Sequence, residues 1–112
     1  MYDFYGFQQE LYNIKYSPTG AKKYAEMAAE ELVDYKVKLT DKWGLDHGAW
    51  SVLTHMYPKA DIPVFQMSLN RQGDEKYHYN LGKKLSALRE KGILIIGSGD
   101  IVHNLRIMNY EL

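Results

Sequence analysis

This chain contains no cysteine, and its charges balance, with 14 Lys and Arg residues against 14 Asp and Glu residues. Without cysteine, neither disulfides nor thiolate metal sites are available, which suits a cytoplasmic protein. A chain with zero net charge and no basic face is not expected to bind nucleic acid. The apolar runs are too short to cross a bilayer, and no apolar signal core follows Met1. We therefore expect neither a membrane protein nor a secreted one.

The length of 112 residues predicts a single domain that spans residues 1–112. A chain of this size buries about two-thirds of the surface that it exposes when unfolded. Hydrophobic residues make up 46% of the sequence and charged residues 25%, the ordinary balance of a globular protein. Neither a linker nor an internal repeat indicates a second domain.

Two apolar runs predict the centre of the fold. Residues Val64–Leu69 and Ile93–Ile96 are typical of strands, and the second run, set between glycines, is typical of a strand buried on both faces. Between them, a helix is expected from about Asp74 to Lys91, with Gly92 as its stop. Its buried stripe would be Tyr77, Leu81, Leu85 and Leu88. Two parallel strands joined by a helix predict a three-layer α/β fold, with a mostly parallel sheet flanked by helices.

Two further helices and an edge strand are expected earlier in the chain. Pro18 and Gly20 introduce a helix for which Thr19 is a candidate cap, and Val37–Thr40 alternates like a short edge strand. Another helix should begin near His47 and end before Pro58. The inward stripe of the first helix would be Tyr24, Ala28, Leu32 and Tyr35, and that of the second Val52, Leu53 and Met56.

The segment from Gly97 to Arg106 follows the second apolar run and contains His103. Open α/β sheets bind ligands at turns that follow the carboxyl ends of their strands. A histidine just beyond such a turn can be a metal ligand or a general base. The alternative is a tight turn followed by a polar loop histidine, and the spacing alone leaves both interpretations open.

A second motif places Asp46 directly before His47, between Gly44 and Gly48. A carboxylate beside an imidazole can fix the tautomer of the ring and raise its basicity. Equally, Asp46 can be the N-cap of a helix that has His47 in its first turn. The local pattern does not choose between these roles.

Taken together, the motifs resemble those of the class III extradiol ring-cleavage dioxygenases, and of the 4,5-DOPA dioxygenase group in particular. The resemblance runs nearly from end to end, in matching order and spacing. The pieces that carry it are Asp3–Phe7, Glu10–Tyr12, Lys15–Gly20, Gly44–Trp50, Met56–Val64, Gln66–Leu69, Leu81–Leu85 with Leu88 and Arg89, Gly97–Gly99 and Val102–Arg106.

The resemblance implies a catechol substrate and a divalent metal, Fe(II) or Zn(II). It places His103 at a position assigned to a metal ligand or to the acid/base, and His47 in the substrate pocket, so both are candidate catalytic residues. Asp46, Asn104 and Arg106 are candidate substrate-binding residues. For Asn104 and Arg106, anchoring of the loop is the alternative role.

The resemblance also indicates what this chain lacks. Family members start upstream of Met1 and carry a His-Gly-Ser-Pro turn and an Ala-His-Trp turn, and a further ligand lies beyond Leu112. None of these motifs occurs here, so we expect the middle part of a dioxygenase domain.

Two functions follow from this expectation. The first is a partial extradiol dioxygenase whose metal site is completed by another chain. The second is a non-catalytic module that keeps the fold, has lost the metal site and binds no metal by itself. In both cases an exposed sheet edge predicts a homo-oligomer or a completing chain, and zero net charge leaves no long-range repulsion to oppose association.

Overall fold

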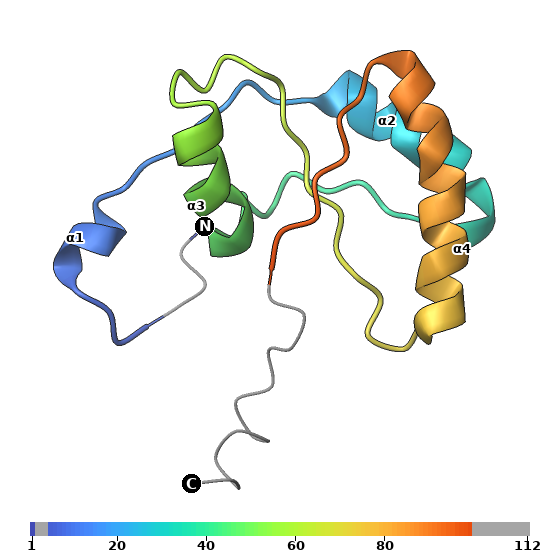
Figure 1. The fold of residues 1–112 in the computed structure, drawn as a ribbon, viewed down its shortest axis with the longest axis horizontal. Coiled ribbons are helices and arrows are strands. Elements are labelled where there is room, and N and C mark those ends of the chain that lie inside the picture. Colours follow the sequence, from blue (N-terminus) through green and yellow to red (C-terminus); the bar gives the residue numbers. More distant parts are fainter. Residues whose placement is uncertain (2–4, 100–112) are drawn as a thin grey trace, which may run out of the picture.

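The computed structural model describes residues 1 and 5–99 (Figure 1). Within them, six helical elements are joined by extended or turning segments. They are α1 (Gln9–Tyr12), α2 (Lys22–Glu31), the 3-10 helix η1 (Val33–Tyr35), α3 (His47–Met56), α4 (Glu75–Leu85) and the 3-10 helix η2 (Ser86–Lys91). None of these helices has the length and apolar character needed to cross a membrane.

The long helix expected from about Asp74 to Lys91 is confirmed as α4 followed directly by η2. The Asp74 carboxylate caps the start and accepts a hydrogen bond from the backbone N–H of Tyr77 at 2.7 Å. At the other end, Gly92 takes a left-handed conformation with φ of 77°, which glycine adopts without steric cost. Both boundaries therefore follow from local chemistry that the sequence displays.

The core lies between α2 and the α4–η2 pair. Leu32 and Leu88 are each only 1% exposed, and Ala28 and Leu81 are also buried. These residues recur at helical spacing, so each helix presents one apolar stripe to the other. Two exposed ion pairs, Lys84–Asp34 and Lys91–Glu31, lie across the same interface. Exposed pairs contribute little, so the leucines carry most of the stability of this interface.

Two expectations for α2 are wrong. Tyr24 is exposed, and Ala21 is buried in its place at the start of the stripe. Thr19 is not the cap, because the helix begins later, and Ala21 holds the N-cap position without a side-chain hydrogen bond. The Thr19 carbonyl instead accepts a hydrogen bond from the N–H of Val64 at 3.4 Å. Thr19, which the local pattern assigned to the helix, therefore pairs through its backbone with a distant segment.

The helix expected near His47 is confirmed as α3, which ends before Pro58. Trp50 and Leu53 are buried. Met56 was expected to face inward but is 49% exposed at the last position of the helix.

The expected sheet is not confirmed. Within residues 1 and 5–99 the structure has no named strand, and its only bridge is a parallel one between Gly20 and Val64. The run 93–96 was expected to be buried on both faces, and this is wrong, because Leu94 is 67% exposed and Ile95 and Ile96 are exposed as well. Residues 37–40 likewise form no edge strand. The apolar pattern indicates side chains that need to be covered, and the described residues leave most of those in the run 93–96 exposed.

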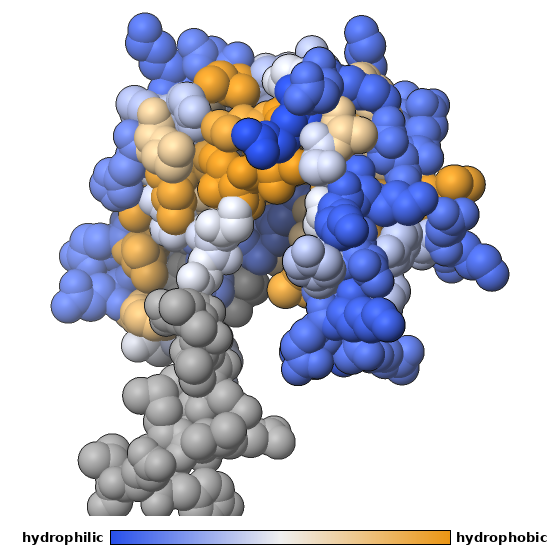
Figure 2. Space-filling view, turned by 45° about the vertical axis from the view of Figure 1, so that its right-hand side comes forward, coloured by the Kyte–Doolittle hydropathy of each residue, from blue (hydrophilic) through white to orange (hydrophobic). Residues whose placement is uncertain are grey.

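The described helices lie on either side of the two extended segments that were expected to be strands (Figure 1). In Figure 1, α1 and α3 lie on one side and α2 with α4 on the other, and the extended segments around residues 64–69 and 93–99 descend between them in the same general direction. Figure 2 shows a broad apolar area on the face turned toward the viewer. An apolar area of this kind is typical of a surface that another chain or segment covers.

Two glycines in and beside α4 give opposite predictions. A β-carbon at Gly73 would lie 2.5 Å from Cδ1 of Tyr77, whereas one at Gly82 would meet nothing within 4 Å. We expect Gly82→Ala to stabilise the chain by about 1 kcal/mol through helix propensity. Gly73→Ala should destabilise it by about 1–3 kcal/mol, because the Tyr77 ring must move. Urea unfolding of both variants measures the difference, and equal effects of the same sign would contradict this account.

Candidate functional site

The two motifs that the sequence singled out lie against each other. Ser98, in the turn after the run 93–96, donates a hydrogen bond from its hydroxyl to the backbone carbonyl of Gly48 in the first turn of α3. These residues are 50 positions apart in the chain. The fold therefore places the Gly97–Gly99 turn beside the residue that follows His47.

Asp46 is the N-cap of α3, which is one of the two roles expected from the sequence. Its Oδ1 accepts a hydrogen bond from the N–H of Ala49 at 2.9 Å. Its backbone is extended, with ψ of 173°, the usual geometry of a capping residue. The cap fixes where the helix begins and makes His47 its first residue.

Gln66 holds the same aspartate from the neighbouring extended segment. Its Nε2 donates to Oδ2 of Asp46 at 2.6 Å, and its Oε1 accepts from the backbone N–H of Asp46 at 2.9 Å. Sequence reasoning did not select Gln66 as a site residue, nor Ser98. The available signal was that both lie within pieces of the family resemblance, Gln66 inside the first apolar run and Ser98 in the turn after the second.

His47 is exposed at the start of α3. The chain terminus lies close by, because the N–H of the Trp50 indole donates to the Met1 carbonyl at 3.0 Å and the Met1 amino group donates to the Leu45 carbonyl at 2.8 Å. His55, near the opposite end of α3, is also exposed. His47 is therefore accessible to a small molecule and stands on a helix end that is held from several directions.

The remaining site residues predicted from the sequence, His103, Asn104 and Arg106, lie outside the described residues. The structure thus brings together Asp46, His47 and the turn that leads to His103. Among residues 1 and 5–99, no group of three or more His, Cys, Asp and Glu side chains could hold a metal ion. The described residues alone do not fit a divalent-metal site.

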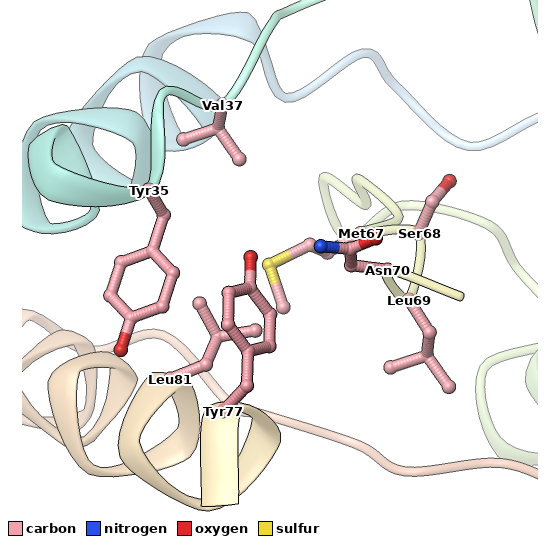
Figure 3. A pocket seen from close by; sticks show the side chains of 8 residues that line it. All are labelled: Tyr35, Val37, Met67, Ser68, Leu69, Asn70, Tyr77 and Leu81. Carbon is pink, nitrogen blue, oxygen red and sulfur yellow. The ribbon is translucent and has the colours of Figure 1, made fainter. Parts of the chain in front are cut away.

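A small pocket of about 200 Å³ lies on the side of α4 (Figure 3). Tyr77 projects from the helix toward Met67. Its ring packs edge to face against the ring of Tyr35, with 5.2 Å between the ring centroids. The full lining is Tyr35, Val37, Met67, Ser68, Leu69, Asn70, Tyr77 and Leu81. The lining contains neither histidine nor carboxylate, so this pocket is separate from the group around His47.

Comparison with known proteins identifies the chain's relatives. A family model described as the catalytic LigB subunit of aromatic ring-opening dioxygenase matches residues 1–111. The chain belongs to this family. The resemblance to extradiol dioxygenases that the sequence indicated is thereby confirmed.

Individual relatives agree with the family match. The chain is 42% identical over 112 residues to a protein of Escherichia coli K12 named 4,5-DOPA dioxygenase extradiol, covering 99% of this chain and 41% of that protein. It is 47% identical over 106 residues to the protein of the same name from Beta vulgaris, covering 92% and 40%. It is 41% identical over 114 residues to dioxygenase tasH of Hapsidospora irregularis, covering 96% and 35%. The chain thus spans about two-fifths of the length of the curated relatives that it matches.

Proposed function

We propose that this chain forms the central part of a catechol ring-cleaving domain of the extradiol type, and that His47 and His103 act on the substrate. The observation that carries the proposal is the hydrogen bond from Ser98 to Gly48, which joins the two motifs shared with the family at one place. The relatives named for 4,5-DOPA cleavage support a catechol as the substrate class.

Opening a catechol ring requires removal of a proton from a hydroxyl group. An exposed imidazole at the start of a capped helix can accept that proton or hydrogen-bond the hydroxyl. Asp46 supports this role by holding the first turn of α3. In this proposal Asp46 orients the substrate-binding region, and His47 contacts the substrate.

We place His103 within reach of His47 from the short length of chain between it and Ser98. It follows Ser98 by five residues, and five residues span at most about 18 Å when fully extended. We assign Asn104 and Arg106 to the same loop, where they anchor it or meet an anionic substituent of the substrate. His47 and His103 should therefore face one cleft.

A divalent metal, Fe(II) or Zn(II), belongs to this proposal, with His103 as the ligand that the chain contributes. When bound, the metal supplies the site at which catechol and O₂ meet. Catalytic metal sites use about three protein ligands. The described residues supply no such cluster, so the proposal requires ligands from a completing segment or chain.

In this proposal another chain completes the sheet, as it completes the metal site. We propose that residues 64–69 and 93–96 are strands of a mostly parallel sheet within one domain of residues 1–112, and that a second copy or a completing chain covers their exposed apolar side chains. A cytoplasmic location, and the absence of nucleic acid and membrane partners, belong to the same proposal.

Titration with DOPA tests substrate binding. In NMR spectra of the isotope-labelled chain, the signals of the His47 ring and of the Gly48 and Ser98 amides should shift saturably. Replacing His47 with alanine should weaken binding about tenfold or more, the equivalent of one hydrogen bond to a charged group. The matched control is His55→Ala, on the same helix and also exposed, which should leave the affinity unchanged. Binding that survives His47→Ala unchanged would contradict the assignment of His47 to the substrate site.

A further inference from the structure

We infer that Gln66 is a positioning residue: its amide clamps Asp46 and thereby fixes where His47 stands. The inference deepens the proposed function and rests on it for its effect on substrate. The clamp has two hydrogen bonds of opposite direction, from Gln66 Nε2 to the Asp46 carboxylate at 2.6 Å and from the Asp46 N–H to Gln66 Oε1 at 2.9 Å. A side-chain amide makes both because it carries an NH₂ donor and a carbonyl acceptor side by side.

The clamp links two parts of the fold that lie 20 positions apart in the chain. Gln66 belongs to the extended segment 64–69, and Asp46 begins α3. One aspartate oxygen holds the helix through Ala49, and the other holds the segment through Gln66. Because His47 is the next residue, a rotation of the Asp46 backbone moves the imidazole directly.

The pair is partly exposed, so its bonds are not required by burial. Gln66 is an exposed residue, and Asp46 is half-buried. A glutamine at an exposed position gains little by packing. The two hydrogen bonds to Asp46 therefore explain a glutamine at this position better than packing does. A side chain of the same size without the amide donor should not replace it.

The test moves the negative charge of the pair from position 46 to position 66. Gln66→Glu keeps the size of the side chain but places a carboxylate against the Asp46 carboxylate, which removes the donor and adds repulsion. Adding Asp46→Asn to Gln66→Glu supplies a new amide donor at position 46 and restores both bonds with one negative charge in total. Gln72→Glu, an exposed glutamine in the turn before α4, is the matched control for the added charge.

We expect Gln66→Glu to shift the NMR signals of the His47 ring and the Ala49 amide, and to weaken DOPA binding about tenfold. The double variant should return the signals toward their original positions and recover the affinity to within about threefold. A purely structural role would lower the thermal midpoint without this rescue of the ring signals. Unchanged His47 and Ala49 signals in Gln66→Glu, or a double variant no better than the single one, would overturn the inference.

The design separates this inference from the proposed function. If DOPA binds neither this chain nor an Fe(II)-loaded relative in which residues 1–112 of this chain replace the matching stretch, the proposed function fails, and the His47 and Ala49 signals still decide whether the clamp exists. If DOPA binds and His47→Ala weakens it, but Gln66→Glu does not, the proposed function stands and Gln66 has no positioning role.

Discussion

Replacing Leu88 with alanine should destabilise the chain by about 2–5 kcal/mol. Leu88 is 1% exposed and packs where η2 meets α2, so truncation removes buried apolar surface and leaves a cavity. A chain of this kind has a total stability of about 5–15 kcal/mol. The variant should therefore unfold at a much lower urea concentration, and a fraction of it should be unfolded near body temperature.

Leu94→Ala is the matched control, because it removes the same atoms from a leucine that is 67% exposed. In dilute protein it should change the stability by no more than about 0.5 kcal/mol. If a second copy covers residues 93–96, as proposed, the same substitution should weaken self-association measured by light scattering. Destabilisation equal to that of Leu88→Ala, at all protein concentrations, would show that this run is already buried within one chain.

The helical parts of the fold could be predicted well from the sequence, because their determinants are local. Asp46 and Asp74 cap the helices that follow them, and Gly92 ends the last one. Each of these residues acts within a few positions of itself, so the pattern around it contains the necessary information.

The extended segments could not be predicted in the same way. An apolar run such as 93–96 indicates that its side chains need partners, but the partners lie elsewhere in sequence or in another chain. The parallel bridge between Gly20 and Val64 is a pairing of this non-local kind. The Thr19 carbonyl, which accepts a hydrogen bond from Val64, takes part in the same non-local pairing.

In the candidate site, too, the sequence revealed the residues with local roles and missed those with non-local ones. Asp46 and His47 were identified from a local motif, and the cap was one of the two expected roles. Gln66 and Ser98 were not identified, because their function depends on hydrogen bonds to residues 20 and 50 positions away. A motif reveals which residues carry chemistry more readily than which residues hold them in place.

The largest functional effect is expected from the two histidines in a complete enzyme. In a chimera, residues 1–112 of this chain would replace the matching stretch of the Escherichia coli relative, which supplies the other three-fifths of its own length. Replacing His47 or His103 with alanine in this chimera should lower kcat/KM for DOPA cleavage by about 10²–10⁴, the range lost with a general acid or base. His103→Ala should also lower the bound Fe(II), whereas His55→Ala should leave both values unchanged.

The rate at which the folded, Fe(II)-supplemented chimera forms yellow ring-opened product from DOPA tests the central claim most directly. We predict product formation by the parent chimera and its loss in the His47→Ala and His103→Ala variants. The fold is verified beforehand by a cooperative unfolding transition and by metal content. A folded, metal-loaded chimera that forms no product, or one whose activity survives both substitutions, would contradict the assignment of this chain to catechol ring cleavage.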